Sequence, residues 1–252
     1  MPLVPFIKSN IKTMEQIKSE MAALRLPGMA GTLKMLEETR KVQELSLQDG
    51  LRLLLQGERD QREARRYARL VKNAAFRYQA TLDEVSFDAS RGLNKSQILS
   101  LATGSYIRNG ESILISGSTG CGKSFIATSF GYQACKQGFS VNYFSMQKLM
   151  AKIKIARIEG VMLRFFEKLA KTDLLILDDF GIGSMDNQQQ LDFMEIIEDR
   201  HARKATIIAS QLPPANWFDL FSDETIADAF MDRMIHTAHR IELKGDSLRK
   251  KR

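Results

Sequence analysis

The chain's architecture follows from residues 111–124, which read Glu111-Ser-Ile-Leu-Ile-Ser-Gly117-Ser-Thr-Gly-Cys-Gly-Lys123-Ser124. The first six of these contain an apolar run that predicts a short buried strand, and residues 125–136 follow helical spacing. The turn between them matches G-x-x-x-x-G-K-[ST], a motif that binds nucleotide phosphates where a strand precedes it and a helix follows it. We therefore expect a nucleotide site at residues 117–124.

The residue types in this turn suit a triphosphate. Glycines let the backbone curl so that successive N–H groups point at phosphate oxygens, and the following helix adds the positive end of its dipole. We expect Lys123 to neutralise the β- and γ-phosphates and the Ser124 hydroxyl to bind Mg²⁺. The expected nucleotide-binding residues are Gly117, Ser118, Thr119, Gly120, Cys121, Gly122, Lys123 and Ser124.

Further apolar runs predict four more strands, at residues 141–144, 174–177, 206–209 and 239–243. Helical patterns fill the gaps between them, which predicts an α/β domain with a parallel sheet flanked by helices on both faces. Ligands of such sheets bind at the carboxyl ends of the strands. Polar residues that follow these strands are therefore candidates for the site.

Two carboxylates end the strand at residues 174–177. We expect Asp178 to hold Mg²⁺ and Asp179 to orient or deprotonate the attacking water. A Glu usually occupies the second position, and Asp is one methylene shorter, so slow or partner-dependent hydrolysis is expected. The alternative is that both acids only cap the turn at residues 180–181.

Two more residues are candidates for sensing the γ-phosphate. Gln211 follows the strand at residues 206–209, with Ser210 as the second choice and a plain turn before Pro213 as the alternative. Arg233 lies on a predicted helix and could reach the nucleotide of a neighbouring subunit as an arginine finger. It could equally pair with Asp232 or Asp228 of its own subunit.

The first 80 residues form a separate helical pattern. Apolar residues recur at helical spacing from Ile7 to Leu24, and Pro27-Gly28 should end that helix. A second pattern covers residues 33–42, and a third begins after Ser46-Leu-Gln-Asp49, which resembles a capping box. We expect a small all-α domain at residues 1–80, a linker at 81–92 and the nucleotide-binding domain at 93–252.

Composition narrows the class of protein. The 252 residues are 44% hydrophobic with only 5 Pro, which excludes a disordered or collagen-like chain. The sequence has no 18-residue apolar stretch and no secretory signal, so we expect a cytoplasmic protein without a membrane partner. The 2 cysteines predict neither a disulfide framework nor a zinc site.

The net charge of +7 favours a polyanionic partner. Basic residues gather at 52–77, at 148–171 and in the tail 240–252, which suggests a long anionic surface such as a nucleic acid rather than one small ligand. The alternative is that these runs are solvated helix faces. The candidate DNA-binding residues of the Arg-rich helix are Arg59, Arg62, Arg65, Arg66, Arg69 and Lys72.

Several segments together resemble one family. Besides the phosphate-binding turn and the Arg-rich helix, they are Leu24-Arg-Leu-Pro-Gly-Met29, Leu175-Ile-Leu-Asp-Asp-Phe-Gly181, Ala209-Ser-Gln-Leu-Pro213 and His239-Arg-Ile-Glu-Leu-Lys-Gly-Asp-Ser-Leu-Arg249. They cover nearly the full chain, which resembles IstB, the ATP-dependent helper of insertion-sequence transposition. This family lies in the AAA+ clade that includes DnaA and DnaC.

The resemblance implies an AAA+ P-loop NTPase. The chain departs from larger AAA+ members in having few residues after Leu243, so we expect a minimal or absent helical lid. The resemblance also implies an ATPase that uses Mg²⁺ and self-assembles on duplex DNA, largely without sequence preference, with nucleotide at the subunit interfaces. Such a protein marks or deforms target DNA and recruits and stimulates the transposase of the same element. Matched by position, Lys123 and Ser124 are phosphate-loop residues, Asp178 and Asp179 the acidic pair, Gln211 the first sensor and Arg233 the finger.

The clade also inserts a helix after the second strand, and residues 146–158 fit it. The resemblance places four basic residues of this helix where they could meet DNA phosphates: Lys148, Lys152, Lys154 and Arg157. Three other functions stay open at this point: a DnaC-like helicase loader, a P-loop kinase and a nucleotide-gated DNA clamp that does not hydrolyse ATP.

Overall fold

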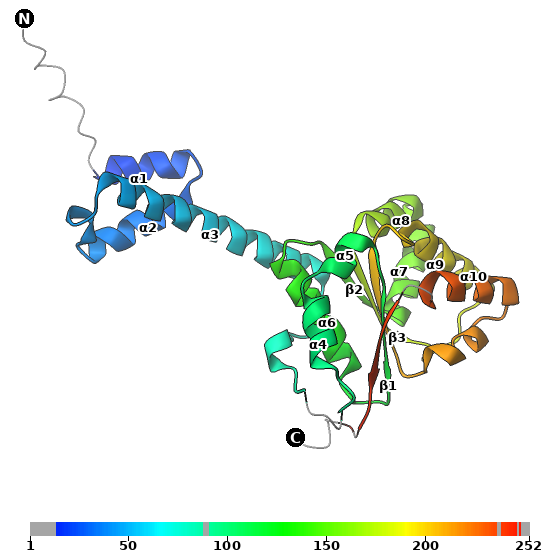
Figure 1. The fold of residues 1–252 in the computed structure, drawn as a ribbon. Helices are drawn as coiled ribbons and strands as arrows, with labels where there is room; N and C mark the ends of the chain where they lie inside the picture. Colours follow the sequence, from blue (N-terminus) through cyan, green and yellow to red (C-terminus); the bar gives the residue numbers. More distant parts are fainter. Residues whose placement is uncertain (1–13, 88–90, 236–237, 246, 248–252) are drawn as a thin grey trace, which may run out of the picture. The chain divides into compact units, whose positions relative to one another are not determined.

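Five parallel strands form the sheet within residues 69–252, in the order β2-β3-β4-β1-β5 (Figure 1). The strands are β1 (Ile113–Gly117), β2 (Val141–Ser145), β3 (Leu174–Phe180), β4 (Ala205–Ser210) and β5 (His239–Leu243). Each falls on one of the predicted apolar runs, and every pairing of neighbours is parallel. The expected α/β fold with a parallel sheet is confirmed.

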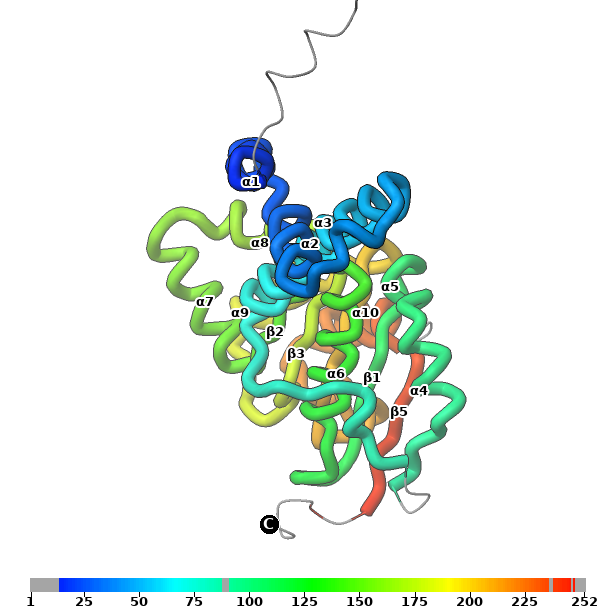
Figure 2. The backbone as a smooth tube through the Cα atoms, turned by 90° about the vertical axis from the view of Figure 1, so that its left-hand side faces the viewer, coloured from blue at the N-terminus to red at the C-terminus, as the bar shows by residue number. Residues whose placement is uncertain are grey.

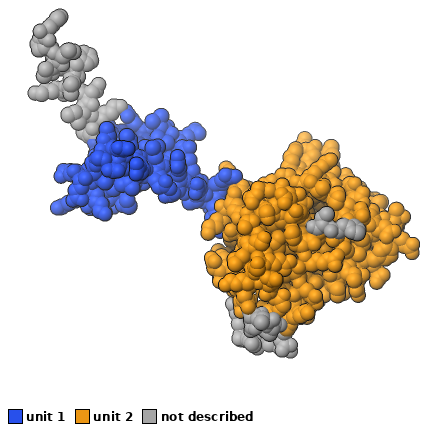
Figure 3. Space-filling view, in the orientation of Figure 1, with its two compact units in different colours: residues 1–68 blue, residues 69–252 orange. Residues whose placement is uncertain are grey.

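The structure is a computed structural model that describes residues 14–87, 91–235, 238–245 and 247. Contacts divide the chain into two units, residues 1–68 and 69–252 (Figure 3). The division falls inside the helix α3 (Leu47–Ala74), earlier than the limit near residue 80 expected from the sequence. Residues 7–13 of the first predicted helix and residues 248–252 of the basic tail lie outside the described part. None of the described helices has the length and apolar character needed to cross a bilayer.

Helices cover both faces of the sheet (Figure 2). One face packs against α4 (Lys95–Ala102), α5 (Ser105–Asn109), α6 (Lys123–Lys136) and the end of α3. The other face packs against α7 (Met146–Ile158), α8 (Met162–Lys171), α9 (Asn187–Arg200) and α10 (Glu224–Ile235). Short 3-10 helices connect these elements: η2 (Leu82–Glu84), η4 (Pro214–Asn216) and η5 (Phe218–Leu220).

The strands are apolar throughout because both faces are buried. On β1, Ile113 and Ile115 belong to the core beneath α6, and Leu114 between them belongs to the core beneath α9 and α10. All three are at most 1% exposed. This burial holds the carboxyl ends of the strands in one row, where the polar residues that follow them can meet.

The smaller unit is helical, as the sequence pattern predicts. Its elements are α1 (Met14–Ala23), α2 (Pro27–Glu38), the 3-10 helix η1 (Lys41–Gln43) and α3 up to residue 68. Pro27 occupies the first turn of α2, where its missing N–H costs no hydrogen bond. The expected cap is present at α3, since the Asp49 N–H donates to Ser46 Oγ at 3.1 Å and Ser46 Oγ donates to Asp49 Oδ2 at 2.6 Å.

Glu58 ties α3 to the start of α2. Its Oε2 accepts the backbone N–H groups of Gly28 at 2.8 Å and Met29 at 3.2 Å, and its Oε1 accepts Arg62 Nε at 2.8 Å. A side chain at Gly28 would place its Cβ 2.4 Å from the Gly57 carbonyl oxygen, so glycine permits this close approach. Burial alone would raise the pKa of Glu58, but these hydrogen bonds outweigh it and lower the pKa.

Candidate nucleotide site

The phosphate-binding turn joins β1 to α6, as predicted. Gly117, Gly120 and Gly122 have φ angles of 149°, 81° and 102°, a region that favours glycine. A Cβ at Gly120 would lie 2.1 Å from Ser247 Oγ, so a side chain there would also collide with the segment that follows β5. A glycine turn at the start of a helix is the kind of backbone that can present N–H groups to a phosphate.

Lys123 is folded over this turn. Its Nζ donates to the carbonyl oxygens of Gly117 at 2.8 Å and Ser118 at 2.9 Å, and the residue is 9% exposed. The ammonium group therefore already lies at the rim of the turn.

Asp178 lies beside Ser124, at the end of β3. Ser124 Oγ donates to Asp178 Oδ1 at 3.0 Å, although the two residues are 54 positions apart in sequence. Asp178 is 1% exposed, and two hard oxygen donors this close suit Mg²⁺, which takes its other ligands from water and phosphate oxygens. In the described part of the chain no cluster of three or more His, Cys, Asp or Glu side chains could hold a metal alone. The residues present thus fit a cation that arrives with a nucleotide.

Tyr143 of β2 also holds Asp178, a role that no motif in the sequence indicates. Its hydroxyl donates to Asp178 Oδ2 at 2.5 Å, and the Asp179 N–H donates to Asp178 Oδ1 at 2.9 Å. Burial, with the nearby charge of Asp178, raises the pKa of Tyr143. The tyrosine therefore stays protonated and acts as a donor, which fixes the orientation of the carboxylate.

A bulge in β3 makes the side chains of Asp178 and Asp179 point in different directions. The register of β3 against β4 shifts between Leu177 and Phe180, and Asp179 has a left-handed backbone with φ 60°. Phe180 is fully buried and packs against Trp217, with ring centroids 4.9 Å apart. Because Phe180 is anchored in this way, the bulge turns Asp179 out of the strand, where its side chain is 39% exposed.

The structure brings Gln211 to the turn and keeps Ser210 away from it. Thr119 Oγ1 donates to Gln211 Oε1 at 2.6 Å. Ser210 is fully buried, and its hydroxyl donates to the Phe180 carbonyl oxygen at 2.7 Å. Gln211 therefore contacts the turn, whereas Ser210 supports the bulge.

Two contacts from outside the motif support the turn. Arg91 Nη2 donates to the Cys121 carbonyl oxygen at 2.5 Å, and Ser118 Oγ donates to the Gly245 carbonyl oxygen at 3.4 Å. Cys121 is buried, as suits a small residue. The described residues after β5 (244, 245 and 247) contain no helix, and Gly245 and Ser247 lie against the turn.

Arg233 lies near the amino ends of the strands, whereas the turn lies at their carboxyl ends. With Ser112 and Thr206, which lie just before β1 and near the start of β4, it lines a small hollow. Its guanidinium forms an ion pair with Glu198 of the same subunit, and Nη1 donates to the Ala229 carbonyl oxygen at 3.1 Å. The five residues of β1 span about 16 Å, so Arg233 is too distant to contact a nucleotide in its own turn.

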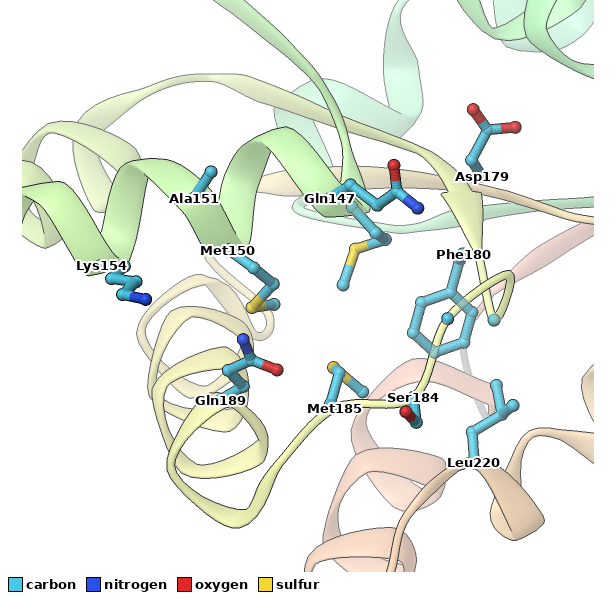
Figure 4. A pocket seen from close by; sticks show the side chains of 13 residues that line it. Gln147, Met150, Ala151, Lys154, Asp179, Phe180, Ser184, Met185, Gln189 and Leu220 are labelled. Atoms are coloured by element: carbon cyan, nitrogen blue, oxygen red, sulfur yellow. The ribbon is translucent and has the colours of Figure 1, made fainter.

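A cavity of about 290 Å³ opens beside Asp179 (Figure 4). Its walls come from the first turns of α7, the loop after β3 and η5. Much of the lining is apolar, from Met146, Met150, Met185, Phe180 and Leu220, and polar groups come from Gln147, Lys154, Ser184 and Gln189. The helix predicted after the second strand therefore borders the proposed catalytic acid.

The candidate DNA-binding residues differ in their partners. Arg62 pairs with Glu58, and Arg157 donates to both carboxylate oxygens of the buried Asp192, at 2.5 and 2.7 Å. Lys152 Nζ lies 5.2 Å from the centre of the Phe144 ring. The remaining candidates are exposed on α3 or α7: Arg59, Arg65, Arg66, Arg69, Lys72, Lys148 and Lys154.

Known sequences match nearly the whole chain. The family model described as IstB-like ATP binding protein matches residues 19–252. The insertion-sequence ATP-binding protein y4pL of Sinorhizobium fredii is 38% identical over 225 residues, which cover 89% of this chain and 92% of that protein. The ATP-binding protein of insertion sequence IS21 from Pseudomonas aeruginosa is 25% identical over 238 residues, with coverages of 94% and 90%.

Solved structures match about two thirds of the chain. AMPPCP-bound DnaA from Aquifex aeolicus has a TM-score of 0.56 and 23% identity, over 69% of this chain and 53% of that one. The DnaC helicase loader has a TM-score of 0.51 and 23% identity, over 66% of this chain and 97% of that one. At these identities the likeness concerns the fold, which is that of AAA+ P-loop NTPases. From the match over residues 19–252 and the geometry of the turn, the chain belongs to the family of IstB-like ATP-binding proteins.

Proposed function

We propose that this protein is an ATPase that assembles on duplex DNA in its ATP-bound state, selects or deforms target DNA for transposition, and recruits and stimulates the transposase of its element. The observation that carries the proposal is the meeting of Lys123, Ser124 and Asp178 at one end of the sheet. The relatives support the link to transposition, because the names of y4pL and of the IS21 protein describe them as insertion-sequence ATP-binding proteins.

ATP would bind with its β- and γ-phosphates in the turn, against backbone N–H groups and Lys123. Ser124 and Asp178 would hold Mg²⁺, which neutralises charge on the phosphates when bound. Asp179 would orient the attacking water and take its proton, and Gln211 would report the γ-phosphate through its contact with Thr119. The short Asp side chain favours slow turnover that DNA or a partner stimulates.

Arg233 would act on the nucleotide of a neighbouring subunit. It lies too far from its own turn, so a role at a nucleotide requires a second copy. It must also leave Glu198, which now occupies its guanidinium. Nucleotide at the subunit interface would then couple assembly to the γ-phosphate.

The basic residues of α3 and α7 would contact DNA phosphates. We assign these contacts to the exposed basic side chains Arg59, Arg62, Arg65, Arg66, Arg69, Lys72, Lys148, Lys152, Lys154 and Arg157. Arg62 and Arg157 would exchange the carboxylates of Glu58 and Asp192 for DNA phosphates. Lysine and arginine on phosphates give little sequence preference, so binding should follow shape and salt. A DNA partner also agrees with the cytoplasmic location expected from the sequence.

ATP turnover measured with and without duplex DNA tests the proposal. We expect slow turnover that rises with DNA, and DNA binding that requires a slowly hydrolysed ATP analogue. If the protein binds DNA equally well with and without nucleotide, ATP does not control its assembly on DNA, and this part of the proposal is wrong. The helicase-loader alternative would be favoured if the full chain bound a hexameric helicase in preference to DNA. The likeness of this chain to the DnaC helicase loader concerns the fold alone.

A further inference from the structure

Residues 75–81 lead from the end of α3 along α6 to the nucleotide site, and no sequence motif gives them a role. Ala75 adopts a left-handed backbone, φ 57°, just after the last residue of α3. Phe76 stacks on Tyr132 of α6, with ring centroids 4.5 Å apart, and meets Tyr143 edge-on at 6.2 Å. The first part of this segment is therefore anchored beside the residue that orients Asp178.

The anchoring is built into α6 and holds the far end as well. A Cβ at Gly131 would lie 2.5 Å from the Phe76 ring, so the helix needs glycine there to receive it. Ser129 Oγ donates to the Thr81 carbonyl oxygen at 3.2 Å, and Thr81 in turn is held by Glu84 through its N–H at 2.8 Å. The segment is thus fixed at both ends along one helix.

The middle of the segment reaches the outer acid of the site. Arg77 Nη1 lies 3.9 Å from Asp179 Oδ2, and the two side chains are 63% and 39% exposed. Arg77 therefore faces the acid proposed to handle water.

We propose that Arg77 is a positioning residue that holds the Asp179 carboxylate in a resting orientation and releases it when α3 binds DNA. The inference rests on the proposed ATPase function. An arginine never loses its charge, and a carboxylate oxygen that faces a guanidinium is not free to orient an attacking water. The contact thus keeps turnover low in the absence of DNA.

The route from α3 to Arg77 is short. Leu70 and Val71 of α3 pack against the core beneath α6, and Ala74 belongs to it at 1% exposure. Arg77 follows Ala74 by three residues. The backbone here is anchored but the Arg77 side chain is 63% exposed, so a DNA phosphate bound along the end of α3 would draw the guanidinium away from Asp179 without moving the helix.

The test compares the full-length wild-type protein with Arg77→Gln, Arg77→Lys and the control Arg203→Gln. Arg203 is an exposed arginine just before β4, at the opposite edge of the sheet, so its substitution removes the same charge away from the site. Turnover with and without DNA is one readout, and calorimetric affinity for a non-hydrolysed ATP analogue is the second. The third readout is hydrogen exchange of residues 76–79 in nucleotide-free protein, measured for the same proteins and also for Asp179→Asn.

We expect Arg77→Gln to raise DNA-free turnover roughly five- to tenfold, equivalent to lowering the barrier by about 1 kcal/mol, and to bring the stimulation by DNA close to one. Analogue affinity should stay within about twofold of wild type, since the contact is to Asp179 and not to phosphate. Exchange at residues 76–79 should quicken in Arg77→Gln and Asp179→Asn alike. Arg77→Lys should fall between, and Arg203→Gln should match wild type.

Three results would overturn the inference. If DNA stimulates the turnover of Arg77→Gln as strongly as that of wild type, the contact between Arg77 and Asp179 does not restrain turnover. Loss of turnover together with weakened analogue binding would make Arg77 a phosphate ligand instead. Absence of turnover in the wild-type protein would overturn the proposed function along with this inference, whereas normal wild-type turnover with an unresponsive Arg77→Gln would overturn the inference alone.

Discussion

Removal of the Tyr143 hydroxyl tests how Asp178 is held. In Tyr143→Phe the buried carboxylate loses the 2.5 Å hydrogen bond to Oδ2 and keeps the donors Ser124 and Asp179 N–H on Oδ1. Hydrogen bonds to charged groups contribute about 1.5–3 kcal/mol, so we expect the free energy of unfolding to fall by about 2 kcal/mol. For a unit the size of residues 69–252 that corresponds to a Tm lower by roughly 4–8 °C.

Urea unfolding of nucleotide-free protein measures this loss, and the chain offers a matched control. Tyr106 is 1% exposed, and its hydroxyl has no hydrogen-bond partner among the described residues. Tyr106→Phe should therefore leave stability unchanged or slightly raised. Combining Tyr143→Phe with Asp178→Asn should cost less than the sum of the two single changes, because both remove one interaction. Equal effects of the two Tyr→Phe changes would refute the argument that Tyr143 supports the charge of Asp178.

Four further outcomes are expected. Lys123→Ala should abolish ATP-dependent assembly on DNA in sedimentation assays, and chelation of Mg²⁺ should abolish turnover. If Lys123→Ala still assembles on DNA, assembly does not depend on ATP bound at the turn. Arg65→Ala and Arg69→Ala each delete one cation proposed to bind a DNA phosphate, so each should reduce the slope of log affinity against log salt by about 0.9, and an unchanged slope would mark these faces as merely solvated. Mixing inactive Arg233→Ala with inactive Lys123→Ala subunits should restore some turnover if Arg233 acts on a neighbour, whereas an inactive mixture would argue against that role. Because hydrogen bonds lower the pKa of Glu58 despite its burial, its contribution to the helical unit should be present above the ordinary carboxyl range and lost as pH falls through the lowered pKa; a Glu58→Gln variant with the same acid melting profile would contradict this.

Local patterns predicted much of the fold. The apolar runs gave all five strands, and the glycine turn with its flanking strand and helix located Lys123 and Ser124. The same holds for the cap at Ser46, because a cap joins residues only three positions apart. In each case, the signal lies within one short window of sequence.

The partners that shape the site lie beyond such windows. Tyr143 precedes Asp178 by 35 positions, and Arg91 precedes Cys121 by 30. Neither residue type is unusual for its place, so only the register of β2 on β3 and the path of the chain before β1 reveal the contacts. The partners of Arg62 and Arg157 were hidden for the same reason, and a run of basic residues read from sequence overstates how many cations are available.

The packing around the β3 bulge also supplies an optical probe. Trp217 is the only tryptophan of the chain, and it lies fully buried against Phe180, next to the acid proposed to act on water. Any rearrangement of the bulge on nucleotide binding would alter the surroundings of the indole. Intrinsic fluorescence of the unmodified protein can therefore follow the catalytic strand directly, without a label.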